Sequence, residues 1–539
     1  MRFRLRAIPV MAAAVLFLIT LGACSSSAPP AASSGAGSAS GPGSGSASSA
    51  PIAQLTGGDV NFYSNVDPNK TQGCNDNYCG LFMEHLLQLG AGNTLKPELA
   101  TSVTQPNSLT YVYHLRRGVT FWDGSPMTSA DVVYSLDYQS KPGVPTSVYF
   151  ENVKTIAADG PDTVAITLKQ PDAGWKYSLS YEGVIFEKAF ALAHPATMGN
   201  PGVLIEGTGP WEIKSLDPTS GMELTANPHW WGGKVPVQQI TVKFFSTETS
   251  EALAMRAGEI DVAFPQGGNT FAAASGAKVT SWSAPGLDFF ATDAKVGPWA
   301  DPHVRRAVAY ALNRTAIIAA NGGPSTAAPA TEIINPSQLL TLGTQSQVNT
   351  LLAGLPQYPY NLAKAKQEMA ESAYPHGFTA VTETANLATF PTVTQAIAAE
   401  LQQIGITLKV QETSVDKWIA DADTTGTPPG GDMYISLGAV SPDPSILPSY
   451  MVGSAATYNT AHYTPAAANS LLAQGVAASD GAQRLAIYGQ LLKQVATDVP
   501  YVPLFSAYSF TALSSKYTLP PFPDYPAFFS WALGTKAAS

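Results

Sequence analysis

Two hydrophobic periods alternate along most of the chain, and together they predict a body built from both helices and strands. Residues 304–312 place apolar side chains at positions i, i+3, i+4, i+7 and i+8, the stripe of an amphipathic helix. A similar stripe covers residues 393–401, and Gly405 can end that helix. Residues 240–244 and 406–410 instead alternate apolar and polar positions, as strands do. The order of these segments predicts an α/β protein with at least two lobes.

Local capping signals indicate where some helices begin. Thr128 and Asp131 have the spacing of a capping box, and we expect the helix that they open to reach Tyr138. Asp301 is followed directly by a proline, which suits an N-cap and the first helical position. Residues 78–87 are also predicted to be helical.

Length, composition and charge exclude several classes of protein. The 539 residues suggest about three or four domains at roughly 150 residues each. A hydrophobic share of 45% with only 13% charged residues excludes a mostly disordered chain. The chain shows no Gly-X-Y period or sustained heptad, and its one long apolar run is N-terminal, which excludes collagen, coiled coil and polytopic membrane protein. Basic minus acidic residues is 29 − 39 = −10, so we do not expect nucleic-acid binding.

The N-terminus has the pattern of an export signal. Three arginines within the first six residues precede the 13-residue apolar stretch Ala7–Ile19, which is too short for a membrane span of about 20 residues. Leu21-Gly22-Ala23-Cys24 then resembles a bacterial lipobox, where cleavage precedes a cysteine that carries a diacylglycerol. We therefore predict a signal peptide over residues 1–23 and a lipidated Cys24. A plain cleaved signal or an uncleaved anchor is the alternative.

A tether follows the predicted lipid. Ser25–Pro51 contains only Ser, Ala, Gly and Pro, so it cannot bury a core, and its r.m.s. reach is roughly 30 Å. Residues 24–56 would thus hold the body at the outer face of the cell membrane, or at its periplasmic side where an outer membrane exists. Cys74 and Cys79, the two other cysteines, are expected to form a disulfide in an exported protein.

The search for catalytic chemistry predicts no enzyme. There is no G-x-S-x-G elbow, phosphate-binding loop or H-E-x-x-H motif. One S-x-x-K occurs at Ser414–Lys417, but the S-D-N and K-T-G motifs that accompany it in β-lactamases are missing. Two thiols do not fill a zinc shell, and the seven histidines lie far apart in sequence, so neither a metal nor a cofactor is expected.

Leu115–Ser135, LRRGVTFWDGSPMTSADVVYS, resembles the signature of the extracellular solute-binding proteins of the dipeptide, oligopeptide and nickel group, which serve ABC importers. Ser129 stands where alanine is usual. Further stretches resemble family segments in the same order: Leu95–Val103, Gly207–Leu216, Ala226–Lys234, Ala254–Ala263 and Val304–Ile317. The resemblance covers roughly residues 57–515.

The resemblance implies a periplasmic-binding-protein-like α/β fold, with two lobes, a hinge and an inserted third domain. It implies closure of the lobes on a ligand and docking of the closed form on ABC permease subunits. We expect a monomer. The implied division is residues 57–90, 205–283 and 505–539 in domain I, 91–204 in domain II, and 284–504 in domain III.

The resemblance also indicates where a ligand would lie. Peptide-binding members carry an amine-binding aspartate in a pattern like G-W-x-x-D-x-x-D-P, which aligns here with Ser436–Ser445. Val440 falls at the aspartate and Leu437 at the tryptophan, and Asp443 is the nearest carboxylate. A buried ammonium without a counter-charge is costly, so another carboxylate substitutes or the ligand lacks a free amine there. The candidate ligand-binding residues are Asn65, Tyr78, Tyr138, Ser436, Leu437, Gly438, Ala439, Val440 and Asp443.

The resulting functional hypothesis is a lipid-anchored solute receptor for an ABC importer, with a di- or oligopeptide as cargo. Extended peptides can be held as an added strand through backbone hydrogen bonds. One alternative is a non-peptide cargo, such as an oligosaccharide, an opine-like molecule or a metal chelate. Others are a sensor that presents its ligand to a receptor, and an enzyme on a binding-protein fold. Aromatic residues in the cleft would favour sugars, and a carboxylate facing a ligand amine would favour peptides.

Overall fold

The computed structural model of the chain provides the architecture that follows. It describes residues 51–60, 64–70, 77–90, 93–283, 285–387, 389–422, 433–438, 441–454, 456–522 and 529–538. The predicted signal peptide, Cys24, the tether up to residue 50, Cys74, Ala439 and Val440 lie outside these residues. The lipid and disulfide therefore stay predictions.

The largest sheet in the described residues has ten strands. Its order is β17-β13-β18-β11-β1-β10-β9-β8, and β12 and β14 also pair with β18. The strands are β1 (Ile52–Asp59), β8 (Trp211–Asp217), β9 (Gly221–Ala226), β10 (Val237–Phe244), β11 (Val262–Ala263), β12 (Lys278–Ser283), β13 (Gly286–Ala291), β14 (Ala327–Pro329), β17 (Met433–Gly438) and β18 (Tyr501–Leu513). β1 and β10 run parallel over nearly their whole length and bury Leu55, Ile240 and Val242.

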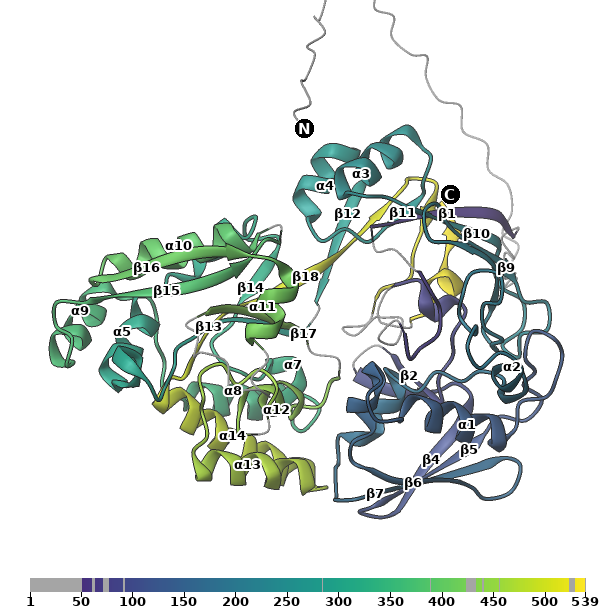
Figure 1. Cartoon of the computed structure of the whole chain (residues 1–539), viewed down its shortest axis with the longest axis horizontal. Helices are drawn as coiled ribbons and strands as arrows, with labels where there is room; N and C mark the ends of the chain where they lie inside the picture. The colour runs from purple at the N-terminus through teal and green to yellow at the C-terminus, as the bar shows by residue number, and fades with distance from the viewer. Residues whose placement is uncertain are drawn as a thin grey trace, which may run out of the picture. The chain divides into compact units, whose positions relative to one another are not determined.

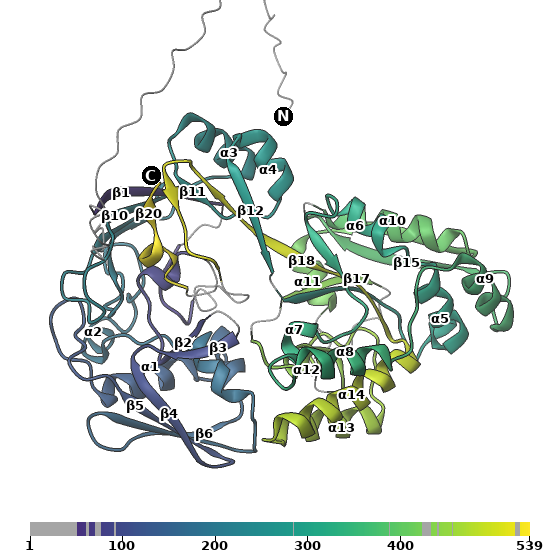
Figure 2. The ribbon, with the colours of Figure 1, turned by 180° about the vertical axis from the view of Figure 1, so that it is seen from behind.

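Strand β18 connects two regions of this sheet. Its first part, Tyr501–Phe505, pairs with β13, and its last part, Tyr508–Leu513, pairs with β12. Figures 1 and 2 show β18 passing from the strands beside β11 and β12 to those beside β13 and β17. The proposed boundary between domains III and I, at residues 504 and 505, thus falls inside one continuous strand.

A separate four-stranded sheet lies within the segment proposed as domain II. Its order is β4-β5-β7-β6, with all pairs antiparallel. Alternate residues of β7 (Val164, Ile166 and Leu168) are buried in a core that includes Val132 and Leu136 of the first helix. The elements of this region are β2 (Leu87–Gly90), β3 (Thr94–Pro97), β4 (Ala100–Asn107), β5 (Thr110–Leu115), α1 (Ser129–Gln139), η3 (Pro145–Phe150), β6 (Val153–Ala158), β7 (Thr163–Leu168), η4 (Trp175–Ser180) and α2 (Lys188–Ala193).

Most remaining helices pack around the strands β13, β17 and β18 and around the parallel pair of β15 and β16. These elements are α5 (Pro302–Ala311), α6 (Arg314–Ala320), α7 (Pro336–Leu339), α8 (Gln345–Ala353), α9 (Leu362–Glu371), β15 (Phe378–Ala385), α10 (Phe390–Gln402), β16 (Ile406–Thr413), α11 (Val415–Ala422), α12 (Ile446–Met451), α13 (Ala466–Ala477) and α14 (Gly481–Asp498). Elsewhere lie η1 (Cys79–Leu81), α3 (Glu248–Ala257), α4 (Gly268–Ser275), η5 (Gly297–Ala300), β19 (Tyr517–Thr518), η6 (Trp531–Gly534) and β20 (Lys536–Ala537).

The capping predictions are confirmed. The Asp131 carboxylate accepts hydrogen bonds from the Thr128 backbone N–H at 2.9 Å and from its hydroxyl at 2.7 Å, at the start of α1. The Asp301 carboxylate accepts from the His303 N–H at 2.8 Å, at the start of α5. Gly405, with a φ of +87°, separates α10 from β16.

The helix predicted over residues 78–87 is wrong. Only the short 3-10 turn Cys79–Leu81 forms, and the chain then extends toward β2. Residues 78–87 are buried without exception, so no solvent-facing side of a helix exists there. A continuous apolar run does not distinguish a helix from buried extended chain by period alone.

In the described part of the chain, no helix combines the length and the hydropathy that crossing a membrane requires.

Candidate functional site

Two candidate residues, Asn65 and Tyr138, meet through Asp67. The Asn65 side-chain oxygen accepts from the Asp67 N–H at 2.6 Å, and the Tyr138 hydroxyl donates to the Asp67 carboxylate at 2.9 Å. Asn69 donates to the Tyr138 carbonyl at 2.7 Å. This network joins the segment after β1 to the C-terminal end of α1. Its polar atoms are engaged with one another, which indicates a structural junction.

Tyr78 lies in a core rather than on a cleft wall. Its side chain is 1% exposed, its hydroxyl donates to the Gly58 carbonyl at 2.7 Å, and its ring packs edge-on against Phe264 and Trp531. We therefore do not assign a ligand contact to Tyr78.

The candidates on β17 alternate between the two faces of the strand. Ser436 and Gly438 are exposed, whereas Leu437 is buried. β17 is the terminal strand of the sheet order, and within the described residues it pairs with β13 alone. Ligand binding at the candidate residues Ser436 and Gly438 is thus compatible with the geometry, while Ala439 and Val440 lie beyond the described residues.

Asp443 is already neutralised by a cation of the protein. It is 3% exposed, and its carboxylate oxygens lie 2.8 and 2.9 Å from Nη2 of Arg484, which is 4% exposed. The same carboxylate accepts from the N–H and hydroxyl of Ser445 at 2.9 and 2.6 Å. Asp443 is therefore a poor counter-ion for a ligand amine, which argues against the substitute role considered from the sequence.

A pocket lies beside Asp443, between the segment after β17 and the region of η3 and η4. It has a volume of about 70 Å³, which is room for one end of a ligand but well below the roughly 300–1,000 Å³ usual for a whole small-molecule site. Its lining residues are Tyr149, Asp172, Gly174, Tyr177, Ser178, Tyr181, Ser441, Asp443, Ser445 and Ile446. The wall is thus rich in tyrosine and serine, with two carboxylates.

The two walls of this pocket touch at its edge. The Ala173 N–H donates to the Val476 carbonyl at 3.0 Å. A Cβ added at Gly174 would lie 2.5 Å from Cγ of Asp443, so the glycine permits this close approach. Burial, and after it the Asp443 charge, raise the pKa of Asp172 to about 6. The regions proposed as domains II and III therefore contact each other through a packed, low-dielectric seam.

Glu182 is a further residue of interest, next along the chain to a residue that lines this pocket. It follows the pocket residue Tyr181 directly, is 1% exposed, and both its carboxylate oxygens lack a hydrogen-bond partner. Burial raises the pKa of Glu182 to about 8. No motif surrounds it, so only its placement in the tertiary structure reveals it.

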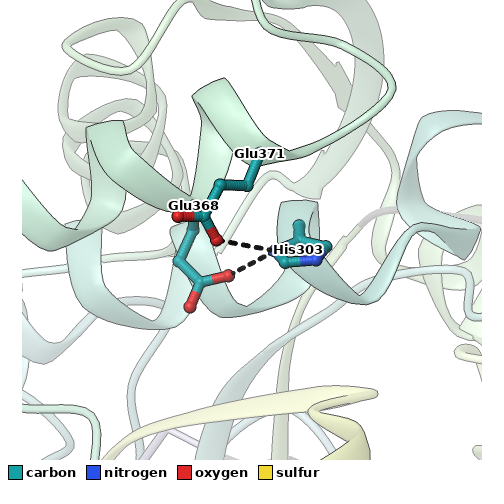
Figure 3. A group of neighbouring side chains, drawn as sticks. All are labelled: His303, Glu368 and Glu371. Carbon is teal, nitrogen blue, oxygen red and sulfur yellow. Dashed lines mark hydrogen bonds and ion pairs between the residues drawn. The ribbon is translucent and has the colours of Figure 1, made fainter.

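A second group of polar side chains lies on α5 and α9. Glu368 and Glu371 approach Nδ1 of His303 at 2.8 and 3.7 Å (Figure 3), and ligand atoms of the three residues lie within 4.8 Å of one another. Arg306 donates to Glu368 at 3.0 Å and lies 2.9 Å from His303 Nδ1. The guanidinium already supplies positive charge to this half-exposed cluster, so we do not assign it a metal.

The signature segment Leu115–Ser135 has a structural role in the region proposed as domain II. The Arg116 guanidinium stacks 3.9 Å from the Trp231 ring and donates to the Glu98 carbonyl at 2.9 Å. The indoles of Trp230 and Trp231 each donate to the Glu84 carboxylate at 3.0 Å. Burial raises the pKa of Glu84 to about 7, against these hydrogen bonds. Three of the similar stretches, Leu95–Val103, Leu115–Ser135 and Ala226–Lys234, therefore meet in one cluster, and none of its residues lines the pocket.

The family model of the bacterial extracellular solute-binding proteins, family 5 Middle, matches residues 94–461, more than half of the chain. The chain belongs to family 5 of these proteins. Membership in family 5 confirms the resemblance deduced from the sequence, together with a non-enzymatic role in solute binding for ABC import. The glutathione-binding protein GsiB of Escherichia coli O1:K1 / APEC is 27% identical over 442 residues, 78% of this chain and 83% of GsiB.

Solved structures confirm the periplasmic-binding-protein fold that family 5 implies. DppA of Helicobacter pylori, in complex with the peptide STSA, has a TM-score of 0.73 at 23% identity and covers 91% of this chain and 99% of its own. AgaA of A. tumefaciens R10, in complex with agropinic acid, has a TM-score of 0.70 at 24% identity and covers 90% and 99%. At these identities the likeness establishes the fold alone.

Proposed function

We propose that the protein is a lipid-anchored receptor that captures a di- or oligopeptide, with one end in the pocket beside Asp443, and delivers it to an ABC permease. The observation that carries the peptide assignment is the edge of β17. Its exposed residues Ser436 and Gly438 lie on the terminal strand of the sheet, and the chain reaches the pocket residue Ser441 directly afterwards. An extended peptide can add to such an edge through backbone hydrogen bonds, which tolerate many side chains.

The relatives support a range of small cargoes that includes peptides. GsiB is named for glutathione, and DppA was solved with a peptide, whereas AgaA was solved with an opine. In this chain a buried carboxylate, Glu182, lies beside the pocket, which favours a ligand that carries an amine. The tyrosines of the pocket wall are the feature that would suit a sugar instead.

Native mass spectrometry of the exported chain carrying Cys24→Ser, purified without denaturation, tests the cargo. We expect retained ligands to give one or more peptide masses, which release and fragmentation would identify as di- or oligopeptides. A single non-peptide mass, such as an opine or an oligosaccharide, would overturn the peptide assignment and leave the family 5 role intact.

We further propose that Cys24 carries the lipid and that residues 25–56 form the tether. The lipobox Leu21–Cys24 and the following Ser, Gly, Ala and Pro residues support this assignment. In cells labelled with a palmitate analogue, the wild-type chain should incorporate label and stay in the membrane fraction. Cys24→Ser should abolish the label and release the protein, whereas Cys79→Ser should keep it. Equal labelling of wild type and Cys24→Ser would contradict the proposal.

A further inference from the structure

Glu182 is a buried carboxylate without a counter-ion. Both of its oxygens are inaccessible and unbonded, and no lysine, arginine or histidine of the described residues forms an ion pair with it. Burial of an ionised carboxylate is costly unless it is paired. Proteins usually satisfy such groups, so an unpaired one beside a pocket requires a physical explanation.

Tyrosines from both sides of the pocket interact electrostatically with Glu182. Burial, and after it the Glu182 charge, raise the pKa of Tyr181. Glu182 also contributes to the raised pKa values of Tyr149 and Tyr450, behind burial and the neighbouring tyrosines. Tyr149 packs 5.7 Å from Tyr181, and Tyr450 packs 6.1 Å from Tyr458, centroid to centroid. We refer to Tyr149, Tyr181, Tyr450 and Tyr458 as the tyrosine group.

The tyrosine group connects Glu182 to the pocket. Tyr149 and Tyr181 line the pocket, and Tyr450 lies on α12, which begins at the pocket residue Ile446. The buried carboxylate thus lies within electrostatic range of tyrosines from both proposed lobes, two of which line the pocket. Aromatic faces and a carboxylate in a desolvated setting are the groups that attract an ammonium ion.

We propose that Glu182 and the tyrosine group bind the cationic group of the solute, which in a peptide is the α-amine. This inference rests on the proposed peptide function and specifies its charged anchor. The negative charge would come from the η4 side of the pocket rather than from the sequence segment Ser436–Val440. The bound ammonium would supply the counter-charge that lets the buried carboxyl ionise, so occupancy and lobe contact would stabilise each other.

Binding of an ammonium group to Glu182 should release a proton and make the affinity depend on pH. A raised pKa means that the ligand-free carboxyl holds its proton up to about pH 8, whereas the ammonium binds the carboxylate. Binding near pH 7 should therefore release close to one proton. Affinity should rise on the order of tenfold from pH 6 to pH 8, then fall as the α-amine, with a pKa of about 8, loses its own proton.

Titratable groups near Glu182 are not expected to cause the same proton release and pH dependence. Tyr149, Tyr181 and Tyr450 stay protonated because burial raises their pKa values. His85, whose side chain bonds the Tyr181 backbone, stays neutral because burial lowers its pKa to about 3. Asp172 lies in the pocket wall, and burial raises its pKa to about 6. An Asp172→Asn variant therefore separates the contribution of Asp172 to the pH dependence of binding from that of Glu182.

Isothermal titration calorimetry of the Cys24→Ser chain, after removal of retained ligand, tests the proposal with glutathione, trialanine and N-acetyl-trialanine. In two buffers of different ionisation enthalpy, the wild-type binding site should release a proton on binding a free-amine peptide. Glu182→Gln should lower the affinity for free-amine peptides by about 30-fold or more and abolish the proton release. The same variant should bind N-acetyl-trialanine with the wild-type affinity.

Two controls separate binding from folding. Glu151→Gln changes an exposed carboxylate of the same region and should leave every titration unchanged. Without ligand, Glu182→Gln should unfold no more readily than wild type, since it removes a buried acid. Free-amine peptides that bind Glu182→Gln as tightly as wild type would overturn the anchor while the peptide function stands. A wild-type protein that binds none of the three peptides would overturn the proposed function, and the inference with it.

Discussion

Replacing Arg484 by leucine should lower the free energy of unfolding by about 3–5 kcal/mol, because it leaves Asp443 as a buried carboxylate without its partner. Arg484 also donates to the Gly475 carbonyl at 2.8 Å and to the Tyr488 hydroxyl at 3.2 Å, so its loss frees further buried acceptors. Chemical denaturation monitored by circular dichroism and tryptophan fluorescence would measure the change. The effect should concentrate in the transition that unfolds α13 and α14.

Two further variants test whether the loss of stability in Arg484→Leu comes from the unpaired Asp443 carboxylate. Lys493→Leu removes an exposed cation from the same helix and should change the free energy of unfolding by no more than about 0.5 kcal/mol. Combining Arg484→Leu with Asp443→Asn removes the unpaired charge and should recover part of the loss. If Arg484→Leu unfolds at the same denaturant concentration as wild type, the Asp443–Arg484 pair does not stabilise the fold.

A valine at position 174 should weaken ligand binding on the order of 10- to 100-fold while the protein remains folded. Its Cβ would overlap the Asp443 carboxylate at the seam between the proposed lobes, and overpacking of this kind costs about 1–3 kcal/mol. The lobes can avoid that cost by separating, which removes the contacts that a ligand gains on closure. Calorimetric affinity and the radius of gyration from small-angle X-ray scattering, with and without ligand, would measure both consequences.

The matched control for Gly174→Val is Ala157→Val. Ala157 is exposed on β6 of the same region, so it receives a branched side chain without a neighbour to meet. Ala157→Val should keep wild-type affinity and the wild-type change in radius on ligand binding. A Gly174→Val protein that closes and binds like wild type would show that the Ala173–Val476 seam is not part of the ligand-bound state.

Local sequence signals predicted those elements whose causes lie within a few residues. The capping box of Thr128 and Asp131 starts α1, and Gly405 separates α10 from β16. Local signals did not predict the conformation of residues 78–87, because distant parts of the chain bury this segment on all sides. Its apolar run carries no periodic signal that could exclude a helix.

The candidate site was predictable only in part. The alignment with peptide-binding members led to Ser436–Ser445, and Ser441, Asp443 and Ser445 of that segment do line a pocket. The other wall, from Tyr149 to Tyr181, belongs to no motif. Asn65, Tyr78 and Tyr138 had been assigned to the cleft by analogy, and their polar atoms instead bond within the protein.

The sequence by itself determined the fold family and the role in solute binding, because collinear motifs preserve the turns, caps and buried clusters that build each lobe. The predicted export signal is likewise a local sequence pattern, which can be recognised without the folded structure. Only the tertiary structure decided which charges are available: it pairs Asp443 with Arg484 and leaves Glu182 unpaired. Charge compensation depends on distance and burial, and both are set by residues far apart in the chain.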